Sequence, residues 1–174
     1  MDIFVPLADR IGLYTMKSEL EDLAFQQLNE FAYEKIEARM EEWRAQESLV
    51  QRTQEELIEE LGKAGIAAEI AGREKTIYSI HRKMGRKSLA FDQLTDIYAY
   101  RIIVGTKRDC YNVLGLMHDV YRAIPGRFKD YISAPKPNGY QSLHTSVIGA
   151  YGNRMEIQIR TQDMHAIAEA GVAA

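Results

Sequence analysis

Apolar and polar residues follow two different periods along this chain. Residues 18–62 are acidic and nearly free of glycine and proline, and their apolar side chains recur at helical spacing, as at Leu57 and Leu61. This pattern predicts two helices. Gly62 marks their end, and the short aliphatic stretch 66–70 predicts a first strand.

After residue 70 the pattern changes to alternating helices and strands with a βαβ-type rhythm. The stretch 96–104 (DIYAYRIIV) is rich in β-branched and aromatic residues, which predicts a buried central strand. Residues 125–139 hold three prolines and two glycines, which predicts a long loop. The other expected elements are a helix with one basic side at 75–87, a helix at 109–121, strands at 140–148 and 154–160, and a last helix that begins near residue 162.

The last two predicted strands each have one apolar and one polar side. The polar members are Tyr140, Ser142 and His144 in the first strand and Glu156, Gln158 and Arg160 in the second. If both polar sides share one face of a sheet, they form a floor suited to a purine. A solvated edge strand has the same pattern, so the alternation alone leaves both readings open.

Charge is distributed unevenly along the 174 residues. The net charge is −3, but residues 72–140 carry 13 Lys and Arg against 6 Asp and Glu. A basic block of this kind can gather phosphates, although a solvated basic face has the same composition.

The single cysteine, Cys110, excludes an internal disulfide and a cysteine-rich zinc site. No apolar run approaches the roughly 20 residues of a membrane span, and residues 1–10 lack the sections of a secretory signal, so we expect a cytoplasmic protein that binds no membrane.

Phosphoryl-group transfer needs carboxylates for Mg²⁺, cations for phosphate oxygens and a base for the attacking hydroxyl. Asp96 and Glu156 are the best-placed carboxylates. Asp96 opens an apolar strand, where metal binding, an arginine or a helix-capping role can account for it. The loop adds Arg127, Lys129 and Lys136. The four histidines lack the spacing of a zinc protease motif, and no Walker phosphate loop or dinucleotide glycine fingerprint is present.

Five polar segments, in this order and spacing, resemble the synthetase domain of the RelA/SpoT alarmone enzymes. They are 72–75 (GREK) with 78–80 (YSI), 96–104 (DIYAYRIIV), 129–132 (KDYI), 138–145 (NGYQSLHT) and 156–161 (EIQIRT). The resemblance implies an α+β fold with a nucleotidyltransferase-like mixed sheet flanked by helices, distantly akin to the polymerase β core. It also implies transfer of the β,γ-pyrophosphate of ATP to the 3′-hydroxyl of GDP or GTP.

The same resemblance implies roles for individual residues. Asp96 matches the Mg²⁺ ligand, and Glu156 matches a carboxylate that ligates metal, activates the 3′-hydroxyl, or does both. On the ATP side, Arg73 and Arg108 match residues that sandwich the adenine, and the contacts to the phosphates match Lys75, Ser79 and Lys83. On the acceptor side, where Tyr140 is expected to stack on guanine, the matching residues are Lys129, Lys136, Asn138, Tyr140, His144, Gln158 and Arg160.

The resemblance further implies a parent protein and a domain boundary. Residues 127–130 (RFKD) are similar to the basic variant of bifunctional members, and residues 6–13 with the helical stretch after them resemble the tail of a hydrolase domain and its connector. We therefore expect a helical extension at 1–64 and a C-terminally truncated synthetase domain at 65–174, excised from a chain that also holds hydrolase and regulatory domains. We expect no nucleic acid as a ligand of this fragment.

Two other functions stay open at this point. One is a nucleotidyltransferase that releases pyrophosphate, although its usual Gly-Ser and paired-aspartate signature is missing. The other is a catalytically silent guanine-nucleotide-binding module. The preference between GDP and GTP and the oligomeric state have no signal in the sequence.

Overall fold

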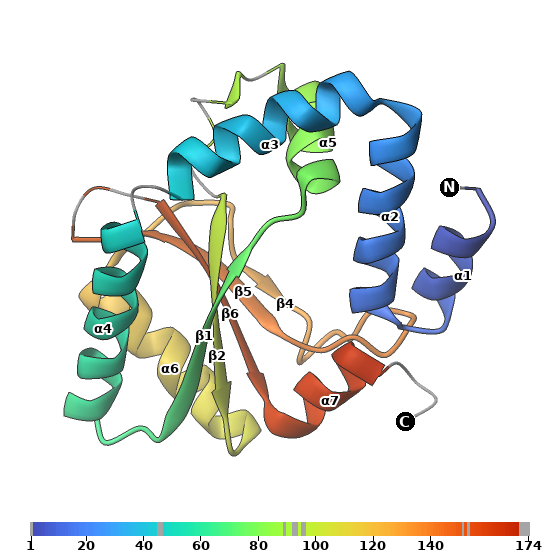
Figure 1. Cartoon of the computed structure of the whole chain (residues 1–174). Coiled ribbons are helices and arrows are strands. Elements are labelled where there is room, and N and C mark those ends of the chain that lie inside the picture. The colour runs from blue at the N-terminus through green and yellow to red at the C-terminus, as the bar shows by residue number, and fades with distance from the viewer. Residues whose placement is uncertain are drawn as a thin grey trace.

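A mixed sheet flanked by helices forms the body of the molecule (Figure 1), as the family resemblance implies. The computed structural model describes residues 2–44, 47–88, 90–91, 94, 97–150, 152 and 154–170. Its helices are α1 (Phe4–Arg10), α2 (Tyr14–Leu28), α3 (Glu30–Arg44), α4 (Glu47–Lys63), α5 (Ile77–Lys87), α6 (Lys107–Val120) and α7 (Gln162–Ala170). Its strands are β1 (Ala68–Glu74), β2 (Tyr98–Val104), β3 (Arg122–Ala123), β4 (Lys129–Asp130), β5 (Leu143–Ile148) and β6 (Arg154–Thr161).

The strands lie in the order β1-β2-β6-β5-β3, and β4 also pairs with β5. Only β2 and β6 pair in parallel. The expected βαβ rhythm is therefore wrong for β1, α5 and β2, because Glu74 at the end of β1 pairs with Tyr98 at the start of β2. The chain leaves the sheet after β1 and returns to it at the same end, so β1 and β2 are antiparallel and α5 lies in the connection between them.

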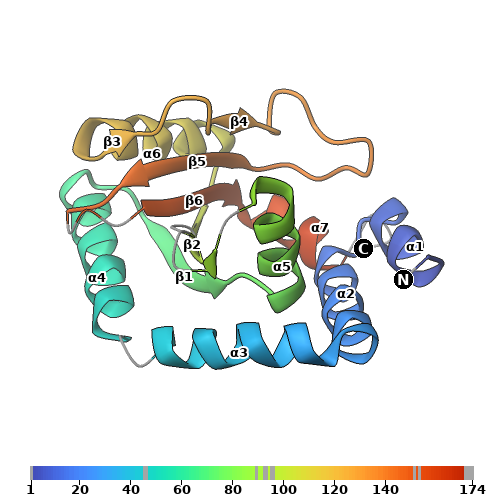
Figure 2. The same cartoon turned by 90° about the horizontal axis from the view of Figure 1, so that it is seen from above.

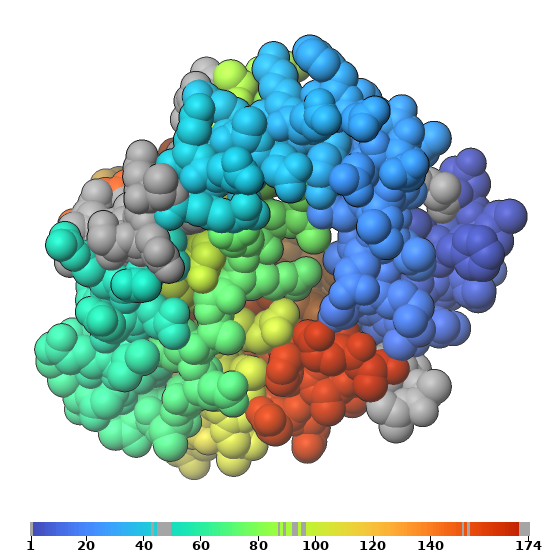
Figure 3. Space-filling view, viewed as in Figure 1, coloured from blue at the N-terminus to red at the C-terminus, as the bar shows by residue number. Residues whose placement is uncertain are grey.

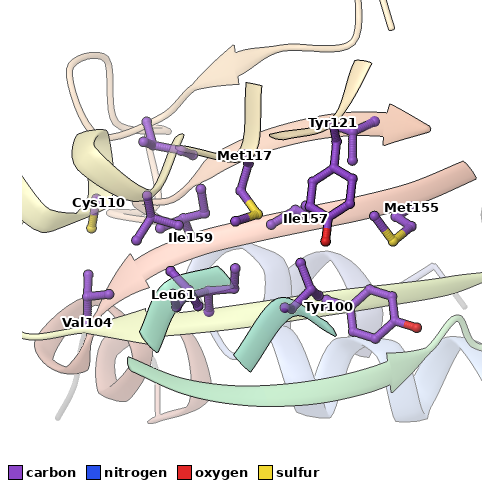
Figure 4. Close-up of a cluster of buried hydrophobic side chains, with 14 of the residues drawn as sticks. Leu61, Tyr100, Val104, Cys110, Met117, Tyr121, Met155, Ile157 and Ile159 are labelled. Carbon is purple, nitrogen blue, oxygen red and sulfur yellow. The ribbon is translucent and has the colours of Figure 1, made fainter. Parts of the chain in front are cut away.

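One face of the sheet is buried under α4 and α6, and alternate residues of the central strands fill the space between (Figure 4). Leu57 and Leu61 of α4 reach this core from the predicted helical extension. Each fully buried aliphatic side chain of this kind contributes about 1.5–3 kcal/mol to folding. The members drawn in the figure with labels are Leu61, Tyr100, Val104, Cys110, Met117, Tyr121, Met155, Ile157 and Ile159.

The stretch expected to form two helices forms three, α2, α3 and α4. Asn29 causes the first break, because its backbone leaves helical geometry at φ −150° and its side-chain Oδ1 accepts a hydrogen bond from the amide of Ala32 at 3.3 Å. One residue thus ends α2 and caps α3. A second hydrophobic cluster, which includes Phe25, Met40 and Ile80, holds α2, α3 and α5 together.

The first strand covers Ala68–Glu74, four residues beyond its expected end at residue 70. Pairing with β2 extends it, and Gly72 permits that pairing. A Cβ at Gly72 would lie 1.9 Å from the hydroxyl oxygen of Tyr98, so any larger residue requires the Tyr98 ring to move.

Three further boundaries differ from expectation near the polar side of the sheet. The loop at 125–139 contains the short strand β4, and β5 begins at Leu143 rather than at residue 140. Helix α5 begins at Ile77, because Thr76 caps it and the amide of Lys75 donates to the carbonyl of Ile97 at 2.9 Å. Lys75 therefore stands just outside the helix, at its N-terminal end.

The other face of the sheet is polar. Figure 2 shows α6 on one side of the strands and α5 on the other, and Figure 3 shows a hollow between α2, α5 and α7. Among the described residues, no helix combines the length and apolar character needed to cross a membrane.

Candidate functional site

His144 of β5 and Glu156 and Gln158 of β6 lie on one face, as the alternation predicts. Strand register sets Ala99 beside Glu156 and Glu156 beside Ser146. In the next row, Gln158 lies beside His144, which lies beside Lys129 of β4. This polar face is the base of the candidate site.

Glu156 is the charged centre of the polar face. Its Oε2 accepts a hydrogen bond from the Nζ of Lys75 at 2.7 Å, and its Oε1 accepts one from the Nε2 of Gln158 at 3.2 Å. Burial opposes ionisation, but the charge and hydrogen bond of Lys75 outweigh it and lower the pKa of Glu156 below its usual value. Glu156 is therefore a mostly buried carboxylate that stays ionised.

A first cavity, of about 150 Å³, lies on the Lys75 side of this ion pair. Arg73 from the end of β1 and Ser79 from the first turn of α5 line it together with Lys75 and Gln158. The sequence predicted three of these residues for ATP, and it placed Gln158 with the acceptor. Glu74, Thr76 and Ala99 complete the lining.

Two side chains that sequence reasoning missed fix the start of α5 beside the first cavity. The Thr76 side chain accepts from the amide of Ser79 at 3.4 Å. The carboxylate of Asp22, from α2, accepts from the amides of Ile77 at 3.3 Å and Tyr78 at 2.7 Å. A carboxylate at a helix N-terminus satisfies free N–H groups and interacts favourably with the helix dipole.

A second cavity, of about 300 Å³, lies on the Glu156 side of the ion pair. Its cationic residues are Arg127 and Lys129, and its lining also includes His144 and Glu156. The remaining lining residues are Gly126, Thr145 and Ser146. The Lys75–Glu156 pair thus joins two cavities that each present positive charge.

The rings of Tyr131, Tyr140 and His144 pack together next to the second cavity and form an aromatic cluster around the Nζ of Lys136. The hydroxyl of Tyr140 lies 2.8 Å from Nε2 of His144, and the Nζ of Lys136 lies 5.0 Å from the ring centre of Tyr140. Burial lowers the pKa of His144 to about 4, and neighbouring lysines add to that effect although Glu156 opposes it. His144 is therefore neutral near pH 7.

Arg160 lies deeper than expected for a residue that contacts a nucleotide. Its side chain is 2% exposed, its Nη2 donates to Oε1 of Glu169 at 3.2 Å, and its Nε has no partner. Arg101 contacts the same Glu169 oxygen at 3.3 Å. Burial lowers the pKa of Arg160 to about 10, and the charge of Arg101 acts in the same direction. Glu169 was missed from the sequence, although its position four residues after His165 on one face of α7 was a usable signal.

Three other expected site residues, Lys83, Arg108 and Asn138, are not among the residues that line the two cavities. Lys83 follows Ser79 by one turn of α5 and is half-buried, and Arg108 is exposed in the first turn of α6. Asn138 donates from Nδ2 to the carbonyl of Asp9 at 3.1 Å. Asp96 lies outside the described residues.

No group of three or more His, Cys, Asp or Glu side chains within the described part of the chain is arranged to hold a metal ion. Glu156 offers a mostly buried, ionised carboxylate at the second cavity. Mg²⁺ is commonly held by one or two carboxylates together with substrate phosphates, so this donor fits such a site.

A mostly buried carboxylate between two cavities that contain Arg and Lys is an arrangement that can bind phosphorylated ligands. Residues 72–174 match the family model described as "Region found in RelA / SpoT proteins". The chain belongs to the RelA/SpoT family.

Relatives agree over the full length of the chain. It is 47% identical over 175 residues to the GTP pyrophosphokinase rsh of Brucella ovis, and the alignment covers 100% of this chain and 23% of that protein. It is also 47% identical to the bifunctional (p)ppGpp synthase/hydrolase SpoT of Escherichia coli, with 100% of this chain and 25% of that protein covered. The chain thus spans about a quarter of the length of these curated relatives.

A solved structure shares the fold. It is a GTP pyrophosphokinase family protein from Streptococcus pneumoniae, which matches with a TM-score of 0.60 and 27% identity over 76% of this chain and 74% of that one. The mixed sheet flanked by helices is therefore the arrangement of this family.

Proposed function

We propose that this chain transfers the β,γ-pyrophosphate of ATP to the 3′-hydroxyl of GDP or GTP, which gives AMP and ppGpp or pppGpp. The Lys75–Glu156 ion pair between two cationic cavities carries the proposal, because the reaction needs two polyphosphates on either side of one acidic group. The relatives named GTP pyrophosphokinase and (p)ppGpp synthase/hydrolase support it.

ATP would occupy the first cavity. Arg73 offers a flat cation for the adenine, and Lys75 and Ser79 offer a point charge and a hydroxyl for the phosphates. Lys83 lies one turn further along α5 and would meet the outer phosphates. The assignment of Arg108 to the adenine rests on the resemblance alone.

The guanine nucleotide would occupy the second cavity and the aromatic cluster beside it. Lys129 and Lys136 would bind phosphates, Asn138 and His144 would supply hydrogen bonds, and Tyr140 would stack on the base. Gln158 and Arg160 would support the acceptor site from the sheet. Gln158 orients Glu156 through a hydrogen bond, and Arg160 is paired with Glu169.

In the transfer step, the 3′-oxygen forms a bond to the β-phosphorus of ATP while the bond between that phosphorus and the α–β bridging oxygen breaks. AMP leaves with the bridging oxygen, and the hydroxyl proton passes to Glu156 or to solvent. Lys75 holds Oε2 of Glu156 at 2.7 Å. When the ATP phosphates draw Lys75 toward them, that oxygen becomes free to accept a hydrogen bond from the hydroxyl.

Asp96 and Glu156 would hold Mg²⁺. When bound, this ion neutralises phosphate charge and polarises the phosphorus that is attacked. A pKa of Glu156 below its usual value favours a ligand or orienting role over strong general-base action near pH 7.

The domain division is also a proposal. Residues 65–174 would form the catalytic domain, and residues 1–64 would connect it to hydrolase and regulatory domains of a longer cytoplasmic protein. The coverage of about a quarter of each relative supports such a parent chain.

The test uses γ-labelled ATP, GDP and Mg²⁺ with the 174-residue chain and with Glu59→Gln, an exposed control. Labelled ppGpp and an equal amount of AMP are expected from both. Release of pyrophosphate would indicate a nucleotidyltransferase instead. Tight guanine-nucleotide binding with no label on guanosine would indicate a silent binding module.

A further inference from the structure

The N-terminal turn of α2 lies directly against Tyr140. The ring centres of Tyr14 and Tyr140 are 4.8 Å apart at an interplanar angle of 63°, which is an edge-to-face contact. Tyr140 is 7% exposed. In Figure 2, the loop that follows β4 reaches toward α1 and α2, so segments far apart in the sequence meet here. A flat base has no open ring face of Tyr140 on which to stack.

Two hydrogen bonds fasten the same N-terminal segment to its surroundings. Asn138 donates to the carbonyl of Asp9 at 3.1 Å. The hydroxyl of Thr15 donates to Oε2 of Glu169 at 2.5 Å, while Oε1 of Glu169 holds Arg160. Single hydrogen bonds contribute little net stability, so this segment can separate reversibly from its surroundings.

Lys136 is enclosed by the same rings. Its Nζ lies 5.8 Å from the ring centre of Tyr14, 4.9 Å from Tyr131 and 5.0 Å from Tyr140. Burial lowers the pKa of Lys136, although its ammonium is stabilised by these ring faces. Tyr14 therefore covers the Tyr140 ring, on which a base would stack, and also contacts the ammonium of Lys136.

We propose that Tyr14 is a gate of the acceptor site. Guanine stacks on Tyr140 only after Tyr14 has left it, and the same movement releases Lys136 toward the phosphates. The proposal rests on the proposed function, since it takes Tyr140 as the guanine platform. It concerns the acceptor, because Tyr14 contacts Tyr140 and Lys136, which are the residues assigned to the guanine nucleotide.

Calorimetric titration of GDP and, separately, of ATP into the full chain tests the gate. Removal of the Tyr14 ring in Tyr14→Ala removes the cost of opening. GDP should then bind about fivefold tighter, the factor that corresponds to an aromatic pair worth about 1 kcal/mol. ATP affinity should not change. Tyr14→Phe keeps the ring and should behave as wild type, as should Met16→Ala, an exposed position of the same helix.

Unchanged or weaker GDP binding by a Tyr14→Ala chain that melts as a folded protein would overturn the gate.

Hydrogen exchange of the wild-type chain gives a second readout that needs no variant. Bound GDP should speed exchange of the backbone amides of residues 17–20, because the first turns of α2 move away; slower or unchanged exchange contradicts the gate. If neither GDP nor GTP binds either chain, the proposed function is wrong, and so is the gate that rests on it. If the wild type transfers pyrophosphate while Tyr14→Ala gains no affinity, only the gate is wrong.

Discussion

The Nζ of Lys75 lies 2.7 Å from Oε2 of Glu156, and the two residues come from the link between β1 and α5 and from the central strand β6. Lys75 lines the first cavity and Glu156 lines the second. Both are about four-fifths buried, with exposed fractions of 21% and 19%. This ion pair therefore separates the two proposed nucleotides and keeps the central carboxylate charged.

Lys75→Met should destabilise the fold by about 2 kcal/mol at pH 7, because it leaves the Glu156 carboxylate buried without its cation. In the wild type, the lowered pKa of Glu156 contributes stability above its unfolded value of 4.5, and that stability is lost as the pH falls through the folded value. In the variant, the charge and hydrogen bond of Lys75 no longer oppose burial, so the pKa of Glu156 rises and the carboxyl takes up a proton at higher pH.

The difference in unfolding free energy between wild type and Lys75→Met should therefore shrink between pH 7 and about pH 4. Urea denaturation at both pH values measures it. Lys35→Met, at an exposed position of α3, is the control and should show a much smaller change with pH. A constant difference across this range would contradict the coupling of Lys75 to Glu156.

His144 should titrate far below an ordinary histidine. Burial lowers its pKa from 6.5 to about 4, so between these values the unfolded chain binds a proton that the folded chain does not. The free energy of unfolding should fall as the pH drops from 6.5 to 4, by at most about 1.4 kcal/mol per pH unit from this group. His144→Gln should lose that part of the slope. An NMR titration of the imidazole measures the pKa directly, and a midpoint near 6.5 would refute the prediction.

Gly72→Ala should destabilise the protein by about 1–3 kcal/mol, because its Cβ would overlap the hydroxyl and ring carbons of Tyr98. Tyr98→Leu should restore part of the loss in the double variant. Gly115→Ala, in α6, meets nothing within 4 Å and is the matched control. Chemical denaturation of the four chains measures the effect, and equal losses at Gly72 and Gly115 would show that Tyr98 does not impose the glycine.

Asp22→Ala should weaken ATP binding about threefold while GDP binding is unchanged, because Asp22 holds the first turn of α5 and Ser79 of that turn lines the first cavity. Asp22→Asn keeps an acceptor oxygen and should lose less. Glu34→Gln, on the exposed side of α3, serves as the control. Titration calorimetry separates the two nucleotides, and an equal loss for both would point to a general loosening of the fold.

Local patterns predicted much of the site. Period-two alternation put His144, Glu156 and Gln158 on one face, since side-chain direction in a strand depends only on neighbouring residues. The same reasoning missed the break at Asn29, although an asparagine that accepts from the amide three residues later is a local signal.

The remaining features depend on residues far apart in the sequence. Lys75 meets Glu156 across 81 positions, and Thr15 meets Glu169 across 154. The extension of β1 to Glu74 depends on pairing with β2, and the burial of Arg160 depends on α7. The spacing of residues along the sequence does not predict these contacts, because they depend on tertiary packing.

Glu156→Gln tests the central claim most directly, since the amide keeps the size of the side chain and removes its charge. The measurement is the rate at which label from γ-labelled ATP reaches the 3′ position of GDP, together with the affinities for both nucleotides. We predict a rate about 10²- to 10⁴-fold below wild type with affinities largely retained. Transfer at the wild-type rate by Glu156→Gln would contradict the account.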